Sequence, residues 1–182
     1  LHTQGALQAT DNVSDLAIQG EGFFRVLLID GTYGYTRDGS FKIDSEGQFV
    51  NSNGYPLQPE FTIPNETTDV VVTRDGHIAA LDSVGNELAA VDIPIYSFVN
   101  PAGLKAIGRN LYLAAEGSGD AVEGTPGTDN FGTLAQGYLE SSNVELVDEM
   151  VSMIVGQRAY EINSKTVTTS DEMLKMAMQL KR

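Results

Sequence analysis

Residues 18–41 read IQGEGFFRVLLIDGTYGYTRDGSF, and the class of the fold follows from the signals in this stretch. The run from Ile18 to Ile29 is strand-like, and Asp30-Gly31 then supplies a turn. After the turn, Tyr33 and Tyr35 alternate with smaller residues. Asp-Gly between alternating apolar residues is a strong hairpin signal, because both residue types tolerate positive φ. The stretch therefore predicts β-strands connected by tight turns.

Similar turn signals recur on the C-terminal side of this stretch, at Arg37-Asp38-Gly39, Glu46-Gly47, Asn53-Gly54, Asp75-Gly76 and Gly85-Asn86. Turns at this frequency predict a β-rich domain of hairpins over residues 15–115. Within that domain, Thr36–Gly39 returns as Thr73–Gly76, and we interpret the two copies as similar hairpins. Gly20-Glu21-Gly22 lacks the third glycine of a dinucleotide fingerprint, so it predicts a bulge or a close backbone approach instead.

Residues 116–130 are rich in Gly, Ser, Thr, Asp and Pro and contain almost no apolar residues. This composition is typical of a loop. Together with the residues that follow, it predicts a loop and return segment over residues 116–142. The acidic residues of this region do not have the spacing of a calcium-binding EF-hand loop.

The last element predicted is a long helix over residues 143–182. Ser142 and Glu145 have the spacing of a capping box, and no proline follows. At 1.5 Å per residue the helix is expected to be about 60 Å long. Thr166 to Ser170 are weak helix formers and predict a kink or fraying there. The fold class predicted is therefore mainly β, with a hairpin domain followed by a coiled-coil-like C-terminal helix.

Apolar residues recur every seven positions along this helix, and a second apolar set widens the stripe. The second set comprises Val147, Val151, Ile154, Val155 and Ile162. The interface predicted for assembly consists of Leu146, Val147, Met150, Met153, Ile154, Gln157, Tyr160, Val167, Leu174 and Met178. A helix with this much apolar surface needs more than one neighbour, and no other long helix is predicted in the chain. The partners are therefore expected to come from sequence outside this chain or from other subunits.

Composition excludes several classes of function. The 182 residues have a net charge of −14, which disfavours a nucleic-acid partner, and there is no cysteine. No apolar run is long enough to span a membrane, and the N-terminus does not read as a secretory signal. His2 and His77 are the only histidines, and His77 is interpreted as a solvated turn residue. No catalytic, cofactor-binding or metal site is predicted, and an enzyme that uses a carboxylate pair has no motif to support it.

Several segments, in order along the chain, resemble the flagellar rod and hook axial protein family. They are Asp15–Phe24, Tyr35–Phe41, Gly54–Pro56, Phe98–Leu104, Gly108–Tyr112, Gln136–Val144, Glu149–Val151 and Gln157–Lys165. The segments around Pro101 and Tyr112 are similar to the distal-rod branch in particular. The last three segments are the strongest match, because together they resemble the signature of the family's terminal helix.

The resemblance implies a structural subunit of a helical homopolymer, the straight distal rod that transmits torque to the hook. The partners it implies are further copies of the chain, proximal-rod and hook subunits, the P- and L-ring proteins and the flagellar type III export apparatus. It places the protein in the flagellar basal body, where the rod crosses the periplasm to the outer membrane. It also implies an N-terminal helix upstream, so residues 1–14 are expected to be a linker. The alternatives are a proximal-rod or hook subunit, or a β-rich secreted binding module with a helical oligomerisation tail.

Overall fold

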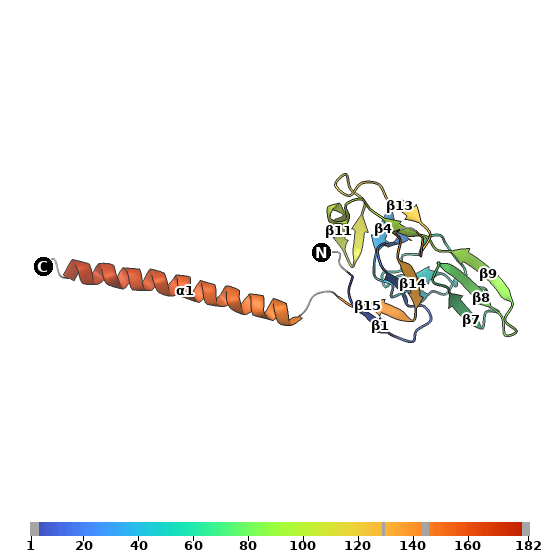
Figure 1. The fold of residues 1–182 in the computed structure, drawn as a ribbon, viewed down its shortest axis with the longest axis horizontal. Coiled ribbons are helices and arrows are strands. Elements are labelled where there is room, and N and C mark those ends of the chain that lie inside the picture. Colours follow the sequence, from blue (N-terminus) through green and yellow to red (C-terminus); the bar gives the residue numbers. More distant parts are fainter. Residues whose placement is uncertain (1–3, 129, 143–145, 180–182) are drawn as a thin grey trace. The chain divides into compact units, whose positions relative to one another are not determined.

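The computed structural model describes residues 4–128, 130–142 and 146–179 (Figure 1). The chain divides into a β unit, Leu1–Ser141, and a helical unit, Ser142–Arg182. Among the described residues, all strands belong to the β unit, and the helical unit contains helix α1. The prediction of a mainly β fold with one long C-terminal helix is confirmed.

Two antiparallel sheets contain most of the hairpins. The first has the strand order β11-β12-β4-β3, with bounds Lys105–Gly108, Leu111–Leu113, Tyr33–Thr36 and Phe24–Leu27. The second has the order β7-β8-β9, with bounds Asp69–Val72, His77–Leu81 and Glu87–Asp92. A short 3-10 helix, η1, covers Pro101–Gly103.

Four two-stranded antiparallel pairs complete the β unit. They are β1 (Leu7–Ala9) with β15 (Tyr138–Glu140), β2 (Leu16–Gln19) with β14 (Thr133–Gln136), β5 (Lys42–Ile43) with β6 (Phe49–Val50), and β10 (Ile95–Ser97) with β13 (Val122–Gly124). Three of these pairs join segments that are distant in sequence. The N-terminal and C-terminal parts of the β unit are therefore tied together by strand pairing.

The turn signals form the hairpins that the sequence predicts at four places. They connect β3 to β4, β5 to β6, β7 to β8, and β8 to β9. Each turn contains a glycine with positive φ, from +79° at Gly31 to +93° at Gly76. Only glycine adopts this conformation without steric cost, which explains why these dipeptides mark the turns.

The run from Ile18 to Ile29 contributes to two sheets. Its first part lies in β2, which pairs with β14, and its second part lies in β3, which pairs with β4. Gly20 separates them with φ +119°, and a Cβ at Gly20 would lie 2.8 Å from the Cα of Gly132. The predicted close backbone approach is therefore confirmed, while the expectation of one strand-like run is wrong.

The two copies of Thr-Arg-Asp-Gly adopt different structures. The second copy is the turn of the β7–β8 hairpin, where Gly76 N–H donates to the Thr73 carbonyl at 3.2 Å. In the first copy, β4 and β5 do not pair, and Leu16 N–H donates to the Gly39 carbonyl at 3.0 Å. The interpretation of two similar hairpins is wrong, because tertiary contacts of the first copy override its turn chemistry.

Residues 116–142, expected as a loop and return segment, contain β13, β14 and β15. Ser118 is 1% exposed, and Pro126 is among the largest fully buried side chains. Small and polar residues can therefore be buried here, since the backbone finds strand partners in β10, β2 and β1.

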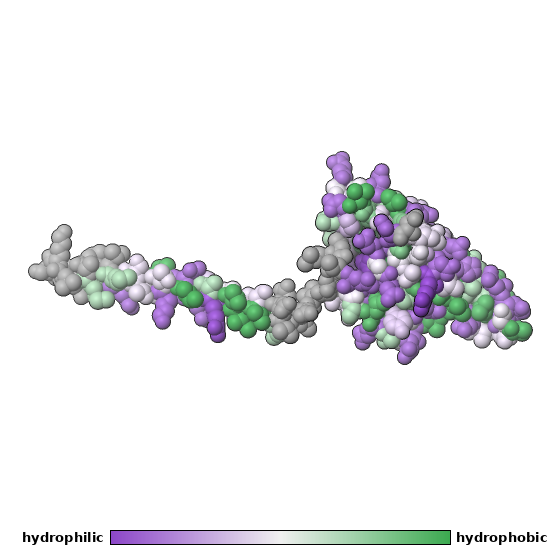
Figure 2. Space-filling view, in the orientation of Figure 1, coloured by the Kyte–Doolittle hydropathy of each residue, from purple (hydrophilic) through white to green (hydrophobic). Residues whose placement is uncertain are grey.

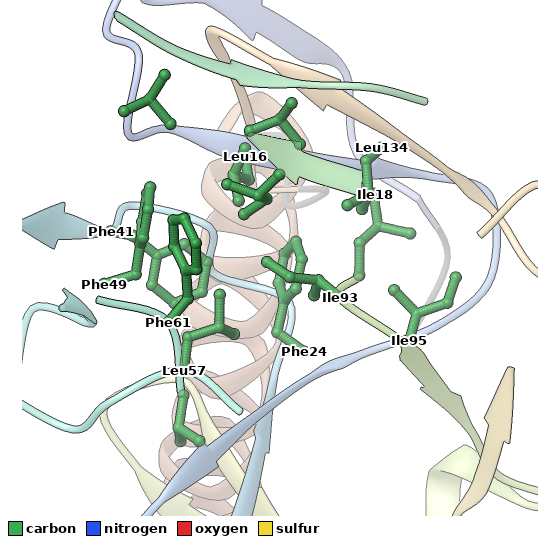
Figure 3. Packing of buried hydrophobic residues seen from close by; sticks show 14 of the residues in the cluster. Leu16, Ile18, Phe24, Phe41, Phe49, Leu57, Phe61, Ile93, Ile95 and Leu134 are labelled. Atoms are coloured by element: carbon green, nitrogen blue, oxygen red, sulfur yellow. The ribbon is translucent and has the colours of Figure 1, made fainter. Parts of the chain in front are cut away.

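The main core lies where the short sheets meet (Figure 3). Side chains converge on it from many segments, and those labelled are Leu16, Ile18, Phe24, Phe41, Phe49, Leu57, Phe61, Ile93, Ile95 and Leu134. A second, aromatic cluster contains Phe23, Tyr35, Tyr96 and Phe98, with the Tyr35 and Phe98 ring centroids 4.8 Å apart. Because no sheet in the described part of the chain exceeds four strands, this shared core holds the β unit together.

Helix α1 runs from Leu146 to Gln179, which corresponds to about 50 Å. It continues without interruption through Thr166 to Ser170, so the expected fraying is wrong, and the expected kink stays a prediction. Thr166 Oγ1 donates to the Ile162 carbonyl at 2.8 Å, and Thr168 Oγ1 donates to the Lys165 carbonyl at 2.9 Å. These hydroxyl groups are satisfied on the helix itself. The capping box expected at Ser142 and Glu145 includes residues 143–145, which lie outside the described residues.

Candidate assembly surfaces

The surface of α1 carries a large number of exposed apolar side chains (Figure 2). Their exposed fractions range from 50% at Ile154 to 76% at Tyr160. The full set is Met150, Val151, Met153, Ile154, Val155, Tyr160, Ile162, Val167, Met173 and Met176. Every described side chain of α1 is exposed. An apolar surface of this extent is typical of a protein interaction site.

The interface residues predicted from sequence fall into two groups. Met150, Met153, Ile154, Gln157, Tyr160 and Val167 are all exposed on α1. The side chains of Leu146, Val147, Leu174 and Met178 lie outside the described ones, although their backbone is helical. The interface that these ten residues were expected to form stays a prediction.

Met173 and Met176 extend the second apolar set and were missed in the sequence. Met173 follows Ile162 by eleven residues, which is three helical turns, so both lie on one face of α1. The intervening Thr169 interrupts the pattern of seven. The three-turn spacing from Ile162 would have indicated Met173, whereas Met176 has no apolar residue at that spacing before it.

The start of the chain and the end of the β unit are joined by the β1–β15 pair, which we call the neck. Its register sets Leu7 opposite Glu140 and Ala9 opposite Tyr138. Ser141 N–H extends the pairing by donating to the Ala6 carbonyl at 2.8 Å. The last residues before the helical unit are therefore held in place by main-chain hydrogen bonds.

Arg37 anchors the neck to the rest of the β unit. Its Nε and Nη2 atoms both lie 2.8 Å from Glu140 Oε2. Its Nη1 donates to the carbonyls of Gly20 and Gly22, both at 3.0 Å, and Nη2 donates to that of Ile18 at 3.3 Å. The Arg37 and Glu140 side chains are only 17% and 12% exposed. This guanidinium therefore connects β15 to the break between β2 and β3.

The other carboxylate oxygen of Glu140 also acts within the neck. Gly5 N–H donates to Glu140 Oε1 at 2.8 Å. A Cβ at Gly5 would collide with the carbonyl of Ser141, so the close approach requires glycine. Glu140 thus links the N-terminal segment, β15 and Arg37 in one network, and such networks hold geometry when fully satisfied.

Gln136 closes the edge of the three-stranded sheet. Its Oε1 accepts from Val72 N–H at 3.0 Å, and its Nε2 donates to the carbonyls of Val70 at 2.8 Å and Val13 at 3.0 Å. The side-chain amide takes the place of a neighbouring strand for β7. This edge is therefore covered, which protects it from pairing with another chain.

His77 lies at the start of β8 and is not only a solvated turn residue. Its Nδ1 lies 2.7 Å from Asp92 Oδ1, and its Nε2 lies 3.8 Å from Glu87 Oε2. The hydrogen bond with Asp92 is the main cause that raises the pKa of His77 above its ordinary value of 6.5. The spacing of these residues in the sequence does not show this contact, because it depends on the register of β8 with β9.

We expect the His77–Asp92 contact to make the stability of the β unit depend on pH. Because the pKa of His77 is raised in the folded state, its contribution is fully present below 6.5 and is lost as the pH rises through the folded value. Urea unfolding at a series of pH values, for the unmodified protein and His77→Gln, tests this. The difference in unfolding free energy between the two should decrease above pH 6.5, and a difference independent of pH would contradict the prediction.

Among the described residues there is no group of three or more His, Cys, Asp or Glu side chains arranged to hold a metal ion. The same part of the chain contains no helix with the length and hydropathy required to cross a membrane.

Two family models match separate parts of the chain. Residues 17–80 match the flagellar hook protein FlgE/F/G D1 domain, and residues 135–180 match the flagellar basal body rod FlgEFG protein C-terminal region. The first match covers the strands from β2 to β8, and the second covers the neck strand β15 and α1.

Several curated proteins are similar over nearly the whole chain. The flagellar basal-body rod protein FlgG of Borreliella burgdorferi is 49% identical over 98% of this chain and 69% of its own length. FlgG of Buchnera aphidicola subsp. Acyrthosiphon pisum is 46% identical over 99% of this chain and 70% of its own length. The flagellar hook-basal body complex protein FlhP of Bacillus subtilis is 30% identical over 94% of this chain and 66% of its own length.

Proposed function

Because this chain belongs to the flagellar basal-body rod protein FlgG family, we propose that α1 is the element through which its copies polymerise. The chain is a structural subunit of the flagellar distal rod and is located in the flagellar basal body. The observation that supports the proposal is the apolar surface of α1, whose described side chains are all exposed.

The helices of many copies pack side by side in this proposal, in a coiled-coil-like inner layer of a helical tube. The two apolar sets of α1 contact different neighbours, since a stripe this wide exceeds one coiled-coil seam. Met150, Met153, Ile154, Gln157, Tyr160 and Val167 form the described part of the interface, and Leu146, Val147, Leu174 and Met178 complete it. Each helix is stabilised mainly by this packing, because an isolated helix is marginal in water.

The neck supports the mechanical part of the proposal. A rod that transmits torque requires each β unit to be held firmly at the point where the chain leaves it. The β1–β15 pairing and the Arg37–Glu140 ion pair hold this point to the core of the β unit. We therefore propose that load passes between the β unit and the helical layer through the neck.

We propose the finer partners on the basis of the resemblance to the family. The rod subunit adjoins proximal-rod subunits at one end and hook subunits at the other, and the P- and L-ring proteins surround it. The subunit is exported unfolded by the flagellar type III apparatus, and a chain with no cysteine forms no disulfide that would oppose unfolding. The family is a structural one, and no catalytic role is proposed.

Negative-stain electron microscopy of the full-length protein, concentrated in moderate salt, tests the proposal. Straight tubes are the expected result, because helices that each contact several neighbours have no reason to close into a small ring. Closed oligomers of fixed size, from protein shown to be folded by circular dichroism, would instead favour a binding module with an oligomerisation tail.

A further inference from the structure

The charge of the molecule is concentrated in the β unit. Residues 1–141 hold 19 of the 25 acidic residues and six of the 11 basic residues, so the β unit has a net charge of −13. Copies arranged around a rod therefore repel one another unless specific contacts offset the repulsion. Contacts between β units are expected where oppositely charged groups can meet.

Two of the six cations of the β unit already have partners within the chain. Arg37 pairs with Glu140, and the Arg25 guanidinium lies 4.4 Å from the ring centroids of Tyr33 and Tyr96. Lys42 and Arg74 are exposed but isolated from other cations in sequence. The remaining two, Lys105 and Arg109, belong to one hairpin, β11–β12.

The β11–β12 hairpin presents these two cations on a defined turn. Arg109 and Asn110 both have positive φ, at 55° and 59°, as in the two-residue turns that suit hairpins. Asn110 Nδ2 donates to Asp38 Oδ2 at 3.2 Å, which holds the turn to the rest of the β unit. Ile107 lies between the two cations in sequence and is 43% exposed. We call Lys105, Ile107 and Arg109 the basic hairpin surface.

The β8–β9 hairpin has the opposite character. Glu87 and Asp92 both lie near His77, so they share the outer face of the hairpin, and their side chains are 54% and 81% exposed. Val84 at the tip is 81% exposed and Leu88 is 38% exposed. We call Val84, Glu87, Leu88 and Asp92 the acidic hairpin surface. Strand β9 is an edge of its sheet, and no other described strand pairs with it, whereas Gln136 covers the β7 edge.

The two hairpin surfaces lie at opposite ends of the β unit, with β11 at one end and β9 at the other (Figure 1). They therefore cannot meet within one copy. Two different, complementary surfaces on opposite ends of a subunit produce head-to-tail contacts, and such contacts build open polymers. Each surface also combines charge with exposed aliphatic side chains, as interface patches commonly do.

We propose that the basic hairpin surface of one copy docks on the acidic hairpin surface of a second copy. The inference rests on the proposed function, since it adds a contact between β units to a polymer built on α1. Arg109 lies against Glu87, and Lys105 or Ile107 extends the contact along β9. Complementary charges of this kind select the correct neighbour and register more than they add affinity.

Disulfide crosslinking tests the contact directly, because the chain has no cysteine of its own. The full-length variant with Arg109→Cys and Glu87→Cys is assembled and then oxidised with diamide. We expect a ladder of covalent oligomers on a non-reducing gel. The control combines Arg109→Cys with Glu46→Cys, an exposed carboxylate position in the β5–β6 turn that belongs to neither surface, and should give little more than monomer.

Charge reversal provides a second test with a rescue. Arg109→Glu alone and Glu87→Arg alone should each raise the concentration needed for assembly by about tenfold. The double variant should assemble at the same concentration as the unmodified protein. Polymers that form normally but give no ladder above the control, with no rescue in the double variant, overturn the docking proposal and leave the role of α1 intact. Failure of the unmodified protein to form any polymer overturns both proposals.

Discussion

Replacing Met153 with Asp should abolish polymer formation while the β unit remains folded. Met153 lies on the recurring apolar stripe of α1 and is 64% exposed in the single chain. Burying a methionine side chain contributes about 1.5–3 kcal/mol, and burying an unpaired carboxylate in its place costs several kcal/mol more. The concentration required for assembly should then rise roughly 100-fold or more. Sedimentation and electron microscopy measure this change.

The matched control is Ser152→Asp. Ser152 is the preceding residue of α1, also exposed, and it lies in the gap between the two apolar sets. The substitution adds the same charge and has a similar effect on helix propensity, but it removes no apolar side chain. Near-UV circular dichroism of both variants reports on the β unit, which contains six of the seven tyrosines. Normal filaments from Met153→Asp would falsify the assignment of α1 as the assembly element.

Replacing Arg37 with Met should cause a large loss of stability in the β unit. The change removes the ion pair with Glu140 and three donations to backbone carbonyls, and it leaves a largely buried carboxylate without its cation. Losing a buried ion pair with its hydrogen bonds lowers the free energy of unfolding by about 2–4 kcal/mol. Urea unfolding followed by the near-UV tyrosine signal measures the loss.

Lys42→Met is the control for this prediction, because Lys42 is an exposed cation on β5. This substitution should change the unfolding free energy by less than about 0.5 kcal/mol. Hydrogen exchange adds a local measurement. In Arg37→Met, the amides of Gly5 and Ser141 should exchange faster, since the neck loses its anchor. Equal stability of the two variants, with unchanged exchange in the neck, would show that Arg37 does not anchor the neck.

Turn chemistry explains why much of the β unit could be predicted. Asp30-Gly31 and Asp75-Gly76 form hairpins because each glycine accepts a positive φ that other residues resist. The requirement is local, so it is visible in two or three consecutive residues. Helix α1 was predictable for a similar reason, since its apolar repeat and lack of proline extend over nearly ten turns.

Local sequence patterns gave wrong predictions where the backbone forms hydrogen bonds with segments that are distant in the chain. Thr36–Gly39 has the residues of a hairpin turn. However, the Arg37 side chain binds Glu140 in the neck, and the Gly39 carbonyl accepts a hydrogen bond from Leu16 N–H. The polar run after Glu116 reads as a loop, yet it contributes β13 to a pair with β10. In both cases the hydrogen-bond partners lie far away in the chain, and no window of neighbouring residues contains them.

The candidate interfaces likewise include one that could be predicted from the sequence and two that could not. The apolar stripe of α1 was visible as a repeat of seven, because residues on one helical face recur at fixed spacing. The acidic and basic hairpin surfaces were not visible, although every charged residue in them was. Glu87 and Asp92 come together near His77 only through the register of β8 with β9.

The amino-acid sequence by itself therefore determined the elements: the hairpin turns, the single long helix with its unpartnered apolar faces, and the family to which these motifs belong. Only the tertiary structure decided which elements pair and pack against one another. Arg37 and Glu140 are 103 residues apart, and the neck pairs residues 7–9 with 138–140. Such contacts form only after the whole core has brought both segments together, because the entropy cost of closing so long a loop must be offset by burial elsewhere.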